Sequence, residues 1–461
     1  MSSRTKKTNM HIDTHKNTIK LFKNSDDIKF LLLPDRHETI TASIYFYFKV
    51  GSKNESPEIN GISHFIEHMI FKGSPNFKSY LDISKTFDAN GISFNAFTSK
   101  DITAYHYKFL SPPAKFEIIC KITSDMILHP LMRDKDILTE RNVIKQELKD
   151  GEDDIDEIIS DTLEYNIFKG HSLDKTIIGT LDTLDNIKQK ELLEFHKKYY
   201  RKDNLLITFS GNMKHSYTNI LNKYFSSSMS NKNIFIPIDI NKQQGPITII
   251  PYEEQNVNST ISCYPKNLKQ DYVSIIFKTK GMFDPHYYNY KILSNILGGN
   301  MSSRLFIQIR EKLGLVYSIS CSITNYEEVG YFSIDTQNEN KDTIQCINAI
   351  LHELKKLISV QQNTTGSITE IELKETKKNY CDIFTTKFDD IEYENEFYSK
   401  QLLYNKIFET IDTRINKINK ISIHDLTNTA RQLFDFTKMH IITFGKITKQ
   451  QLKKLSIPEH K

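Results

Sequence analysis

The sequence predicts an α+β fold built from two halves that repeat the same order of elements. Strand-like apolar segments are followed by helical patterns, and this order occurs twice along the chain. A polar stretch rich in Ser and Asn, residues 226–244, separates the two occurrences and has the composition of a linker. A length of 461 residues also favours two or three domains over a single hydrophobic core.

Each half is expected to contain a strand, a helix, further strands and then long helices. In the first half these elements are expected at 39–50, around 62–69, through 95–110, and from 116 to about 168. In the second half they are expected at 272–280, 287–297, through 317–336, and at 342–360 and 367–403. The resulting division is a disordered tail at 1–18, a first domain at 19–225, a linker at 226–258 and a second domain at 259–461.

The helix expected around 62–69 carries two imidazoles one turn apart with a carboxylate between them, at His64, Glu67 and His68. Residues four apart on a helix lie on the same side, so both rings can reach one ion while Glu67 leans over it. An apolar stripe lies on the opposite side and consists of Ile62, Phe65, Ile66 and Met69. The pattern predicts a catalytic zinc site; the alternative is two exposed histidines on an ordinary surface helix.

A third zinc ligand is expected in a second helical segment, because a catalytic zinc usually takes three protein ligands and one water. Glu140 and Glu147 lie two turns apart there and point the same way. They border an apolar face, where an unpaired carboxylate is costly and a zinc ion or a zinc-bound imidazole is a suitable partner. The alternative is that both glutamates pair with Arg141 or Lys145 in water.

This combination resembles the pitrilysin/insulinase-type zinc metallopeptidases with the inverted HxxEH motif. It is similar in particular to the processing-peptidase branch, which includes the catalytic β subunit of mitochondrial processing peptidase and bacterial processing proteases. The resemblance runs from about residue 20 to about residue 450, and its further segments are 61–73, 95–99, 177–180, 195–200, 298–304 and 310–317. It implies two homologous α/β-sandwich-like halves, each an antiparallel-rich sheet covered by helices, with the zinc site in the first.

The resemblance also implies a role for each matched residue of the motif. His64, His68 and Glu147 would bind one Zn²⁺ per chain. Glu67 would be the general base that takes a proton from the attacking water. Glu140 would hold a ligand histidine from behind.

The second half is expected to contribute to substrate binding and not to bind zinc. Residues 290–297, at the position that corresponds to the zinc helix, contain no His or Glu. The resemblance implies that Arg310 and Tyr317 reach the bound peptide and, with the metal, stabilise the carbonyl oxygen in the transition state. The alternative for these two residues is a surface arginine and a core tyrosine.

Two further segments are expected to bind the substrate. Residues 93–99 form a strand-like pattern in which an exposed edge, around Asn95 and Ala96, would accept an extended peptide as an added strand. The alternative is an interior hairpin strand. Glu157 and Asp161 share a helix face and match, in the family, acidic positions that receive an arginine near the cleavage point. This match favours basic, presequence-like peptides, whereas the alternative is a solvated acidic face.

Composition excludes several other classes of protein. The five cysteines are scattered and form no Cys-x-x-Cys, so neither a disulfide framework nor a thiolate metal site is expected. The net charge of +4 is small and the lysines are spread evenly along the chain, so the composition does not support nucleic-acid binding. No apolar run approaches the length of a membrane span, and no secretory signal is expected. The expected location is intracellular, cytoplasmic by default, with mitochondria as the alternative.

The sequence therefore predicts a zinc-dependent endopeptidase that acts on extended polypeptides. Relatives of this size usually work as dimers, so the resemblance implies a homodimer or a heterodimer with an inactive relative. The alternative function is a non-catalytic core or scaffold subunit, or a peptide-binding protein, of the same fold.

Overall fold

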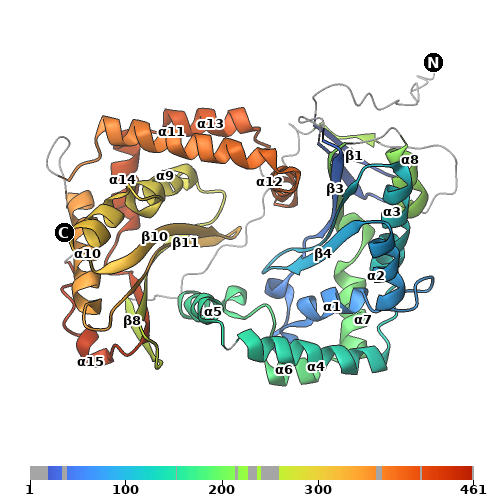
Figure 1. The fold of residues 1–461 in the computed structure, drawn as a ribbon, viewed down its shortest axis with the longest axis horizontal. Coiled ribbons are helices and arrows are strands. Elements are labelled where there is room, and N and C mark those ends of the chain that lie inside the picture. The colour runs from blue at the N-terminus through green and yellow to red at the C-terminus, as the bar shows by residue number, and fades with distance from the viewer. Residues whose placement is uncertain are drawn as a thin grey trace, which may run out of the picture. The chain divides into compact units, whose positions relative to one another are not determined.

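The structure is a computed structural model of the chain, drawn in Figure 1, and it describes residues 19–33, 39–151, 153–212, 216–226, 236–239, 259–359, 366–404 and 408–458. The chain forms two units. Unit 1 consists of Met1–Gly245 and Phe388–Phe408, and unit 2 consists of Pro246–Lys387 and Glu409–Lys461. The tail predicted at 1–18 and most of the linker predicted at 226–258 lie outside the described residues.

Unit 1 is built on a seven-stranded sheet in the order β4-β5-β3-β6-β2-β1-β7. Its strands are β1 Lys20–Lys23, β2 Lys29–Leu32, β3 Thr41–Phe48, β4 Ile92–Thr98, β5 Thr103–Leu110, β6 Leu205–Gly211 and β7 Ile236–Pro237. Neighbouring strands are antiparallel except β2 and β6, which are parallel. Within the described residues β4 pairs with β5 alone, so β4 is an edge strand.

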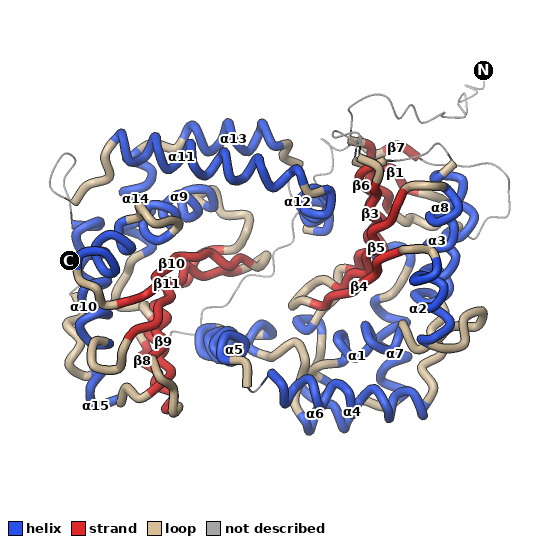
Figure 2. The backbone as a smooth tube through the Cα atoms, in the orientation of Figure 1, coloured by secondary structure: helices blue, strands red, loops and turns tan. Residues whose placement is uncertain are grey.

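Helices cover both faces of this sheet. They are α1 Ile62–Ile70, α2 Tyr80–Ala89, α3 Pro113–Leu128, α4 Asp134–Gly151, α5 Ile155–Ile167, α6 Leu181–Asn186, α7 Gln189–Tyr199, α8 Tyr217–Phe225 and α12 Ile391–Leu403. In Figure 2, α3 and α8 lie on one side of the sheet and α12 lies on the other. The core is rich in aromatic rings: Phe116 stacks on Tyr217 with ring centroids 4.0 Å apart, and Phe46 meets Tyr107 edge to face. The sequence pattern does not predict α2.

Residues 388–408 belong to unit 1, whereas the sequence prediction assigned them to the second domain, 259–461. Helix α12 packs on β3 and β6. The Thr208 hydroxyl of β6 donates to the Asn395 side chain of α12, and the Ser210 hydroxyl donates to the α12 main chain at 2.8 Å. Periodicity reveals that this segment is helical, but it carries no signal for which of two sheets the helix covers.

Glu392 ties α12 to β5 and makes this contact sensitive to acid. Its carboxylate lies 2.8 Å from the Lys108 ammonium and 3.6 Å from the His106 ring. His106 first, and Lys108 second, lower the pKa of Glu392 to about 2, against about 4.3 in an unfolded chain. Because the folded-state pKa is the lower one, the stabilisation is complete above about pH 5 and disappears as the pH falls to about 2.

We expect Glu392→Gln to lower the free energy of unfolding at pH 7 and to reduce its further loss between about pH 5 and pH 3. Urea denaturation at a series of pH values measures both effects. Glu396→Gln, four residues along the same helix and partly exposed, is the matched control. Parallel stability–pH curves for the wild type and Glu392→Gln would contradict the assigned pKa.

Unit 2 is built on a five-stranded sheet in the order β10-β11-β9-β12-β8. Its strands are β8 Thr260–Pro265, β9 Asp271–Lys280, β10 Val316–Asn325, β11 Val329–Asn338 and β12 His440–Gly445. Its helices are α9 Tyr287–Gly298, α10 Thr343–Ser359, α11 Glu370–Thr386, α13 Ile411–Lys420, α14 Ile423–Leu433 and α15 Lys449–Leu452. The pairs β10–β11, β11–β9 and β9–β12 are antiparallel, and β12 and β8 are parallel. The five strands β4-β5-β3-β6-β2 of unit 1 follow the same order of three antiparallel pairs and one parallel pair.

The repeated strand pairing confirms the predicted α+β class with two similar halves and antiparallel-rich sheets. The helical stretch expected at 367–403 is divided, since a 3-10 turn at Lys387–Asp389 separates α11 from α12. Among the described residues, no helix has both the length and the apolar run needed to cross a bilayer.

Candidate metal centre

Helix α1 begins at a buried cap made by the Glu55 side chain. The Gly61 N–H donates to Glu55 Oε2 at 2.7 Å, the Ser63 N–H donates to Oε1 at 2.8 Å, and the Asn60 amide donates at 2.8 Å. Burial raises the pKa of Glu55, and these donors act against that rise. Gly61 has φ 98°, and a Cβ there would lie 2.5 Å from the Ile178 carbonyl oxygen, so the helix start requires glycine. The cap fixes the first turn of the helix that carries the motif.

The two faces of α1 have the polarity that the sequence predicts. The apolar residues Ile62, Phe65, Ile66 and Met69 are fully buried. His64, Glu67 and His68 are only partly buried and lie on the other side of the helix. The helix predicted for the motif is therefore present, with a core-facing side and a side that presents His, Glu and His.

The structure brings His64, His68 and Glu147 together, although Glu147 comes from α4. His64 Nε2 lies 3.3 Å from Glu147 Oε2, and His68 Nε2 lies 3.7 Å from the same oxygen. The two imidazole centroids are 4.5 Å apart, and one donor atom from each of the three residues falls within a span of 4.8 Å. A tetrahedral zinc with bonds of about 2.0–2.2 Å holds its donors about 3.3–3.5 Å apart. Two nitrogens and one carboxylate oxygen at these distances fit a zinc ion, with a fourth position left for water.

Charges around the cluster favour a cation. Burial by itself lowers the pKa of His64, but the hydrogen bond to Glu147 and the charges of Glu67 and Glu147 outweigh it and raise this pKa overall. The same hydrogen bond from His64 lowers the pKa of Glu147. The carboxylate is thus held ionised next to the imidazoles, and a metal ion that binds here displaces a proton.

Glu140 contacts the far side of the His68 ring. It is 4% exposed, and its Oε1 accepts from His68 Nδ1 at 2.9 Å, while Lys72 forms an ion pair with Oε2. Burial acts to raise the pKa of Glu140, but His68 and Lys72 outweigh it and lower this pKa overall. An ionised carboxylate only accepts, so Nδ1 of His68 carries the proton of this hydrogen bond, and Nε2 lies on the side of the ring that faces Glu147. Lys72 was not foreseen from the sequence.

The alternative partners for these glutamates are engaged elsewhere. The Arg141 guanidinium donates to the main-chain carbonyls of Leu184 and Ile187 at 3.0 and 2.7 Å. The Lys145 ammonium pairs with Asp185 at 2.6 Å. The interpretation that Glu140 and Glu147 pair with Arg141 or Lys145 is therefore wrong.

Glu67 faces the edge strand β4. The Thr98 hydroxyl, at the end of β4, donates to Glu67 Oε2 at 2.6 Å. Asn95 is exposed on this strand, and its side-chain oxygen accepts from the Ala96 N–H at 2.9 Å. The alternative of an interior strand for 93–99 is wrong, because among the residues that the structure describes β4 pairs with β5 alone. No spacing rule singles out Thr98 or Glu55, so neither residue could be predicted from the sequence.

The predicted acidic substrate contacts lie on α5. Glu157 is exposed in its first turn, and Asp161 is half-buried one turn further on. Burial raises the pKa of Asp161 to about 6, helped by Glu164 and Glu157 and opposed by Lys100. Lys100 and Glu164 form a buried ion pair of 3.0 Å beside it. Asp161 is therefore not part of a fully solvated face.

Arg310 and Tyr317 lie together in unit 2. The Arg310 side chain donates to the Tyr317 carbonyl oxygen at 2.9 Å and lies 4.6 Å from the centroid of the Phe306 ring. The Tyr317 side chain is 79% exposed, so the alternative of a core tyrosine is wrong.

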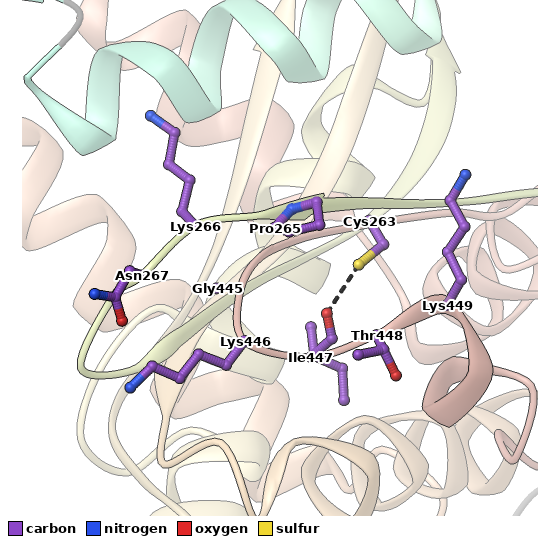
Figure 3. A pocket seen from close by; sticks show the side chains of 9 residues that line it. All are labelled: Cys263, Pro265, Lys266, Asn267, Gly445, Lys446, Ile447, Thr448 and Lys449. Carbon is purple, nitrogen blue, oxygen red and sulfur yellow. Dashed lines mark hydrogen bonds between the residues drawn. The ribbon is translucent and has the colours of Figure 1, made fainter.

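Unit 2 also contains a cavity of about 650 Å³ at the ends of β8 and β12, shown in Figure 3. It is lined by Cys263, Pro265, Lys266, Asn267, Gly445, Lys446, Ile447, Thr448 and Lys449. The Cys263 thiol donates to the Ile447 carbonyl oxygen at 3.0 Å, and the three lysine side chains point in different directions (Figure 3). The cavity presents no converging ligand set and holds no residue of the metal centre.

Comparison with known sequences identifies the family to which this fold belongs. Residues 31–181 match the family model described as Insulinase (Peptidase family M16), and residues 186–380 match the one described as Peptidase M16 inactive domain. The chain therefore belongs to the insulinase family of M16 peptidases, and the predicted family resemblance is confirmed.

Relatives of similar length carry the name of zinc proteases. The chain is 30% identical over 407 residues to "Uncharacterized zinc protease YmxG" of Bacillus subtilis, which covers 88% of this chain and 93% of that one. It is 29% identical over 395 residues to an "Uncharacterized zinc protease" of Rickettsia felis, covering 86% and 90% of the two chains. A crystal structure of a protease from Helicobacter pylori has the same fold, with a TM-score of 0.79, 20% identity and coverage of 93% and 100%.

Proposed function

We propose that this protein is a zinc-dependent endopeptidase that cleaves extended polypeptide segments. The observation that carries the proposal is the meeting of His64, His68 and Glu147, from two helices, at distances that suit one tetrahedral zinc ion. Relatives named zinc proteases support the same cofactor. A zinc ion held by these three residues would supply Lewis-acid activation of a water molecule and of the substrate carbonyl.

Glu67 is the proposed general base. It stands on the same face of α1 as the two histidines, three residues after His64, and this shared face supports a position of its carboxylate next to the proposed water. The carboxylate takes a proton from the attacking water and then transfers it to the leaving nitrogen. Glu140 orients His68 and keeps its Nε2 available, and the Lys72 ammonium balances the buried charge of Glu140.

The substrate is proposed to bind along β4 as an added strand. In the described part of the chain, the outer edge of β4 has no strand partner, so its main-chain donors and acceptors can bind an extended peptide with little demand on the peptide's side chains. Asn95 and Ala96 lie on this edge. Glu157 and Asp161 are proposed to receive a basic side chain, so that cationic, presequence-like peptides are preferred. Arg310 and Tyr317 are proposed to donate to the substrate carbonyl.

The test is a digest of an unbiased peptide library by the purified full-length protein, with zinc measured in the same sample. We expect about one zinc per chain, cleavage that stops when a chelator removes the metal, and recovery when zinc is restored. One zinc per chain without cleavage of any peptide would instead favour the non-catalytic scaffold. The oligomeric state, proposed as a homodimer or a heterodimer with an inactive relative, is read from light scattering of the same sample.

A further inference from the structure

We propose that Thr98 is a positioning residue that holds the Glu67 carboxylate in the orientation needed for proton transfer. This inference rests on the proposed role of Glu67 as general base. The Thr98 hydroxyl donates to Glu67 Oε2 at 2.6 Å, a short distance that is typical of a hydroxyl bound to a charged carboxylate. Within the described residues, Oε1 of Glu67 receives no hydrogen bond, so one oxygen is fixed and the other is left to accept a proton.

A base on α1 needs such support because a glutamate side chain has several freely rotating bonds. Glu67 is partly exposed, so packing alone does not select one rotamer. A misplacement of about 1 Å between a base and its proton is enough to cost about two orders of magnitude in rate. Threonine is suited to holding a partner, because its branched Cβ restricts χ1 and the hydroxyl therefore points in a defined direction.

Thr98 is itself held firmly by the sheet and by the turn that follows it. It pairs with Thr103 of β5 at the end of the β4–β5 hairpin. The turn at 99–102 is closed by a hydrogen bond from the Ser99 N–H to the Ile102 carbonyl oxygen at 2.8 Å. The Lys53 N–H donates to the Lys100 carbonyl oxygen at 2.7 Å, which joins the turn to the segment before α1.

Two side chains of the same turn anchor it to other elements of unit 1. Lys100 is 5% exposed, pairs with Glu164 of α5 at 3.0 Å and donates to the Leu173 carbonyl oxygen at 3.3 Å. The Tyr404 hydroxyl, just after α12, donates to Asp101 at 2.8 Å. The orientation of Glu67 thus depends on a turn that a buried ion pair and a buried tyrosine keep in place.

The position of Thr98 also connects substrate binding to the base. Thr98 is on the strand that is proposed to accept the substrate, and its hydroxyl contacts the proposed base directly. A peptide added to β4 would therefore lie in a fixed register relative to the Glu67 carboxylate. This arrangement makes the rate of the chemical step, more than the affinity for the peptide, depend on the Thr98 hydroxyl.

The test compares Thr98→Val, Thr98→Ser and Thr103→Val in the full-length, zinc-loaded protein. Thr98→Val keeps the shape and removes the hydroxyl, so we expect kcat to fall about 10- to 100-fold with KM within about twofold of the wild type. Thr98→Ser keeps the hydroxyl and should recover most of kcat. Zinc affinity should be unchanged in both variants, because the Thr98 hydroxyl bonds to Glu67, which is not one of the three proposed ligands.

Thr103→Val is the matched control, since Thr103 is the cross-strand neighbour of Thr98 and its hydroxyl donates to the Val50 carbonyl oxygen at 2.9 Å instead. We expect a lower melting temperature with kcat unchanged. A wild-type kcat in Thr98→Val, or a kcat in Thr98→Ser as low as in Thr98→Val, overturns the proposal. Glu67→Gln measured in parallel separates the two claims: if it is inactive while Thr98→Val is fully active, only the role of Thr98 fails. If Glu67→Gln is fully active, the base assignment and the role of Thr98 fail together.

Discussion

Glu67→Gln is expected to bind zinc as the wild type does and to lose about three orders of magnitude in kcat. The amide has nearly the shape of the carboxylate, and its oxygen still accepts from the Thr98 hydroxyl, so the site should keep its structure. It has no lone pair basic enough to take a proton from water, so the contribution of a general base, about 10²- to 10⁴-fold, is lost. Peptide hydrolysis under saturating substrate, with zinc content determined on the same sample, measures both quantities.

The matched control is Glu194→Gln, an exposed glutamate on α7 that should leave zinc content and kcat unchanged. Hydrolysis by Glu67→Gln at the wild-type rate would refute the assigned base. Loss of zinc in this variant would also contradict the assignment, because it would indicate that Glu67 is a zinc ligand and not the general base.

His68→Ala should weaken zinc binding about 100- to 1,000-fold, because it removes one of the three proposed protein ligands. Glu140→Gln should weaken it about 10- to 100-fold: the amide oxygen still accepts from His68 Nδ1, but the negative charge that Lys72 balances is gone. His352→Ala, at an exposed position on α10, is the control and should have no effect. Competition with a chelator of known affinity gives the zinc dissociation constants of the wild type and of the three variants at one pH.

The order of these effects is the informative part of the experiment. Substitution of a direct ligand should reduce zinc affinity more than substitution of a residue that acts through a ligand. Both substitutions should reduce it more than replacement of a distant histidine. If Glu140→Gln cost more than His68→Ala, Glu140 would be a ligand itself, and the roles of Glu140 and Glu147 would have to be exchanged.

Local spacing was enough to predict the helix of the motif and the side of it that faces the core. His64, Glu67 and His68 lie within one and a half turns of α1, where side-chain direction follows from helical geometry alone. The α+β class with two similar halves was also predictable, because strand and helix patterns alternate in the same order twice. The meeting of α1 with Glu147 of α4 required the family resemblance, since spacing along the chain does not say which helices touch.

Contacts between distant segments could not be predicted in this way. The placement of α12 on the sheet of unit 1 depends on partners such as Asn395 and Thr208, which are nearly 190 residues apart. Thr98 becomes recognisable only when β4 is seen next to α1, and Glu55 only when its carboxylate is seen on the amides of Gly61 and Ser63.

The burial of a charged side chain also could not be predicted from composition. For Glu157 and Asp161 the sequence left two interpretations open, a solvated acidic face or a contact for basic substrates. Asp161 is half-buried next to the Lys100–Glu164 ion pair, and burial raises its pKa to about 6. A carboxyl group of this kind is partly protonated near neutral pH, so its attraction for a basic side chain should weaken as the pH falls through about 6.

Anomalous diffraction at the zinc absorption edge, from crystals of the zinc-loaded Glu67→Gln protein, tests the central claim most directly. The predicted result is one strong peak about 2.0–2.2 Å from His64 Nε2, His68 Nε2 and a carboxylate oxygen of Glu147, with a water in the fourth position. A protein that contains stoichiometric zinc but shows its peak elsewhere, with these three side chains apart, would contradict it.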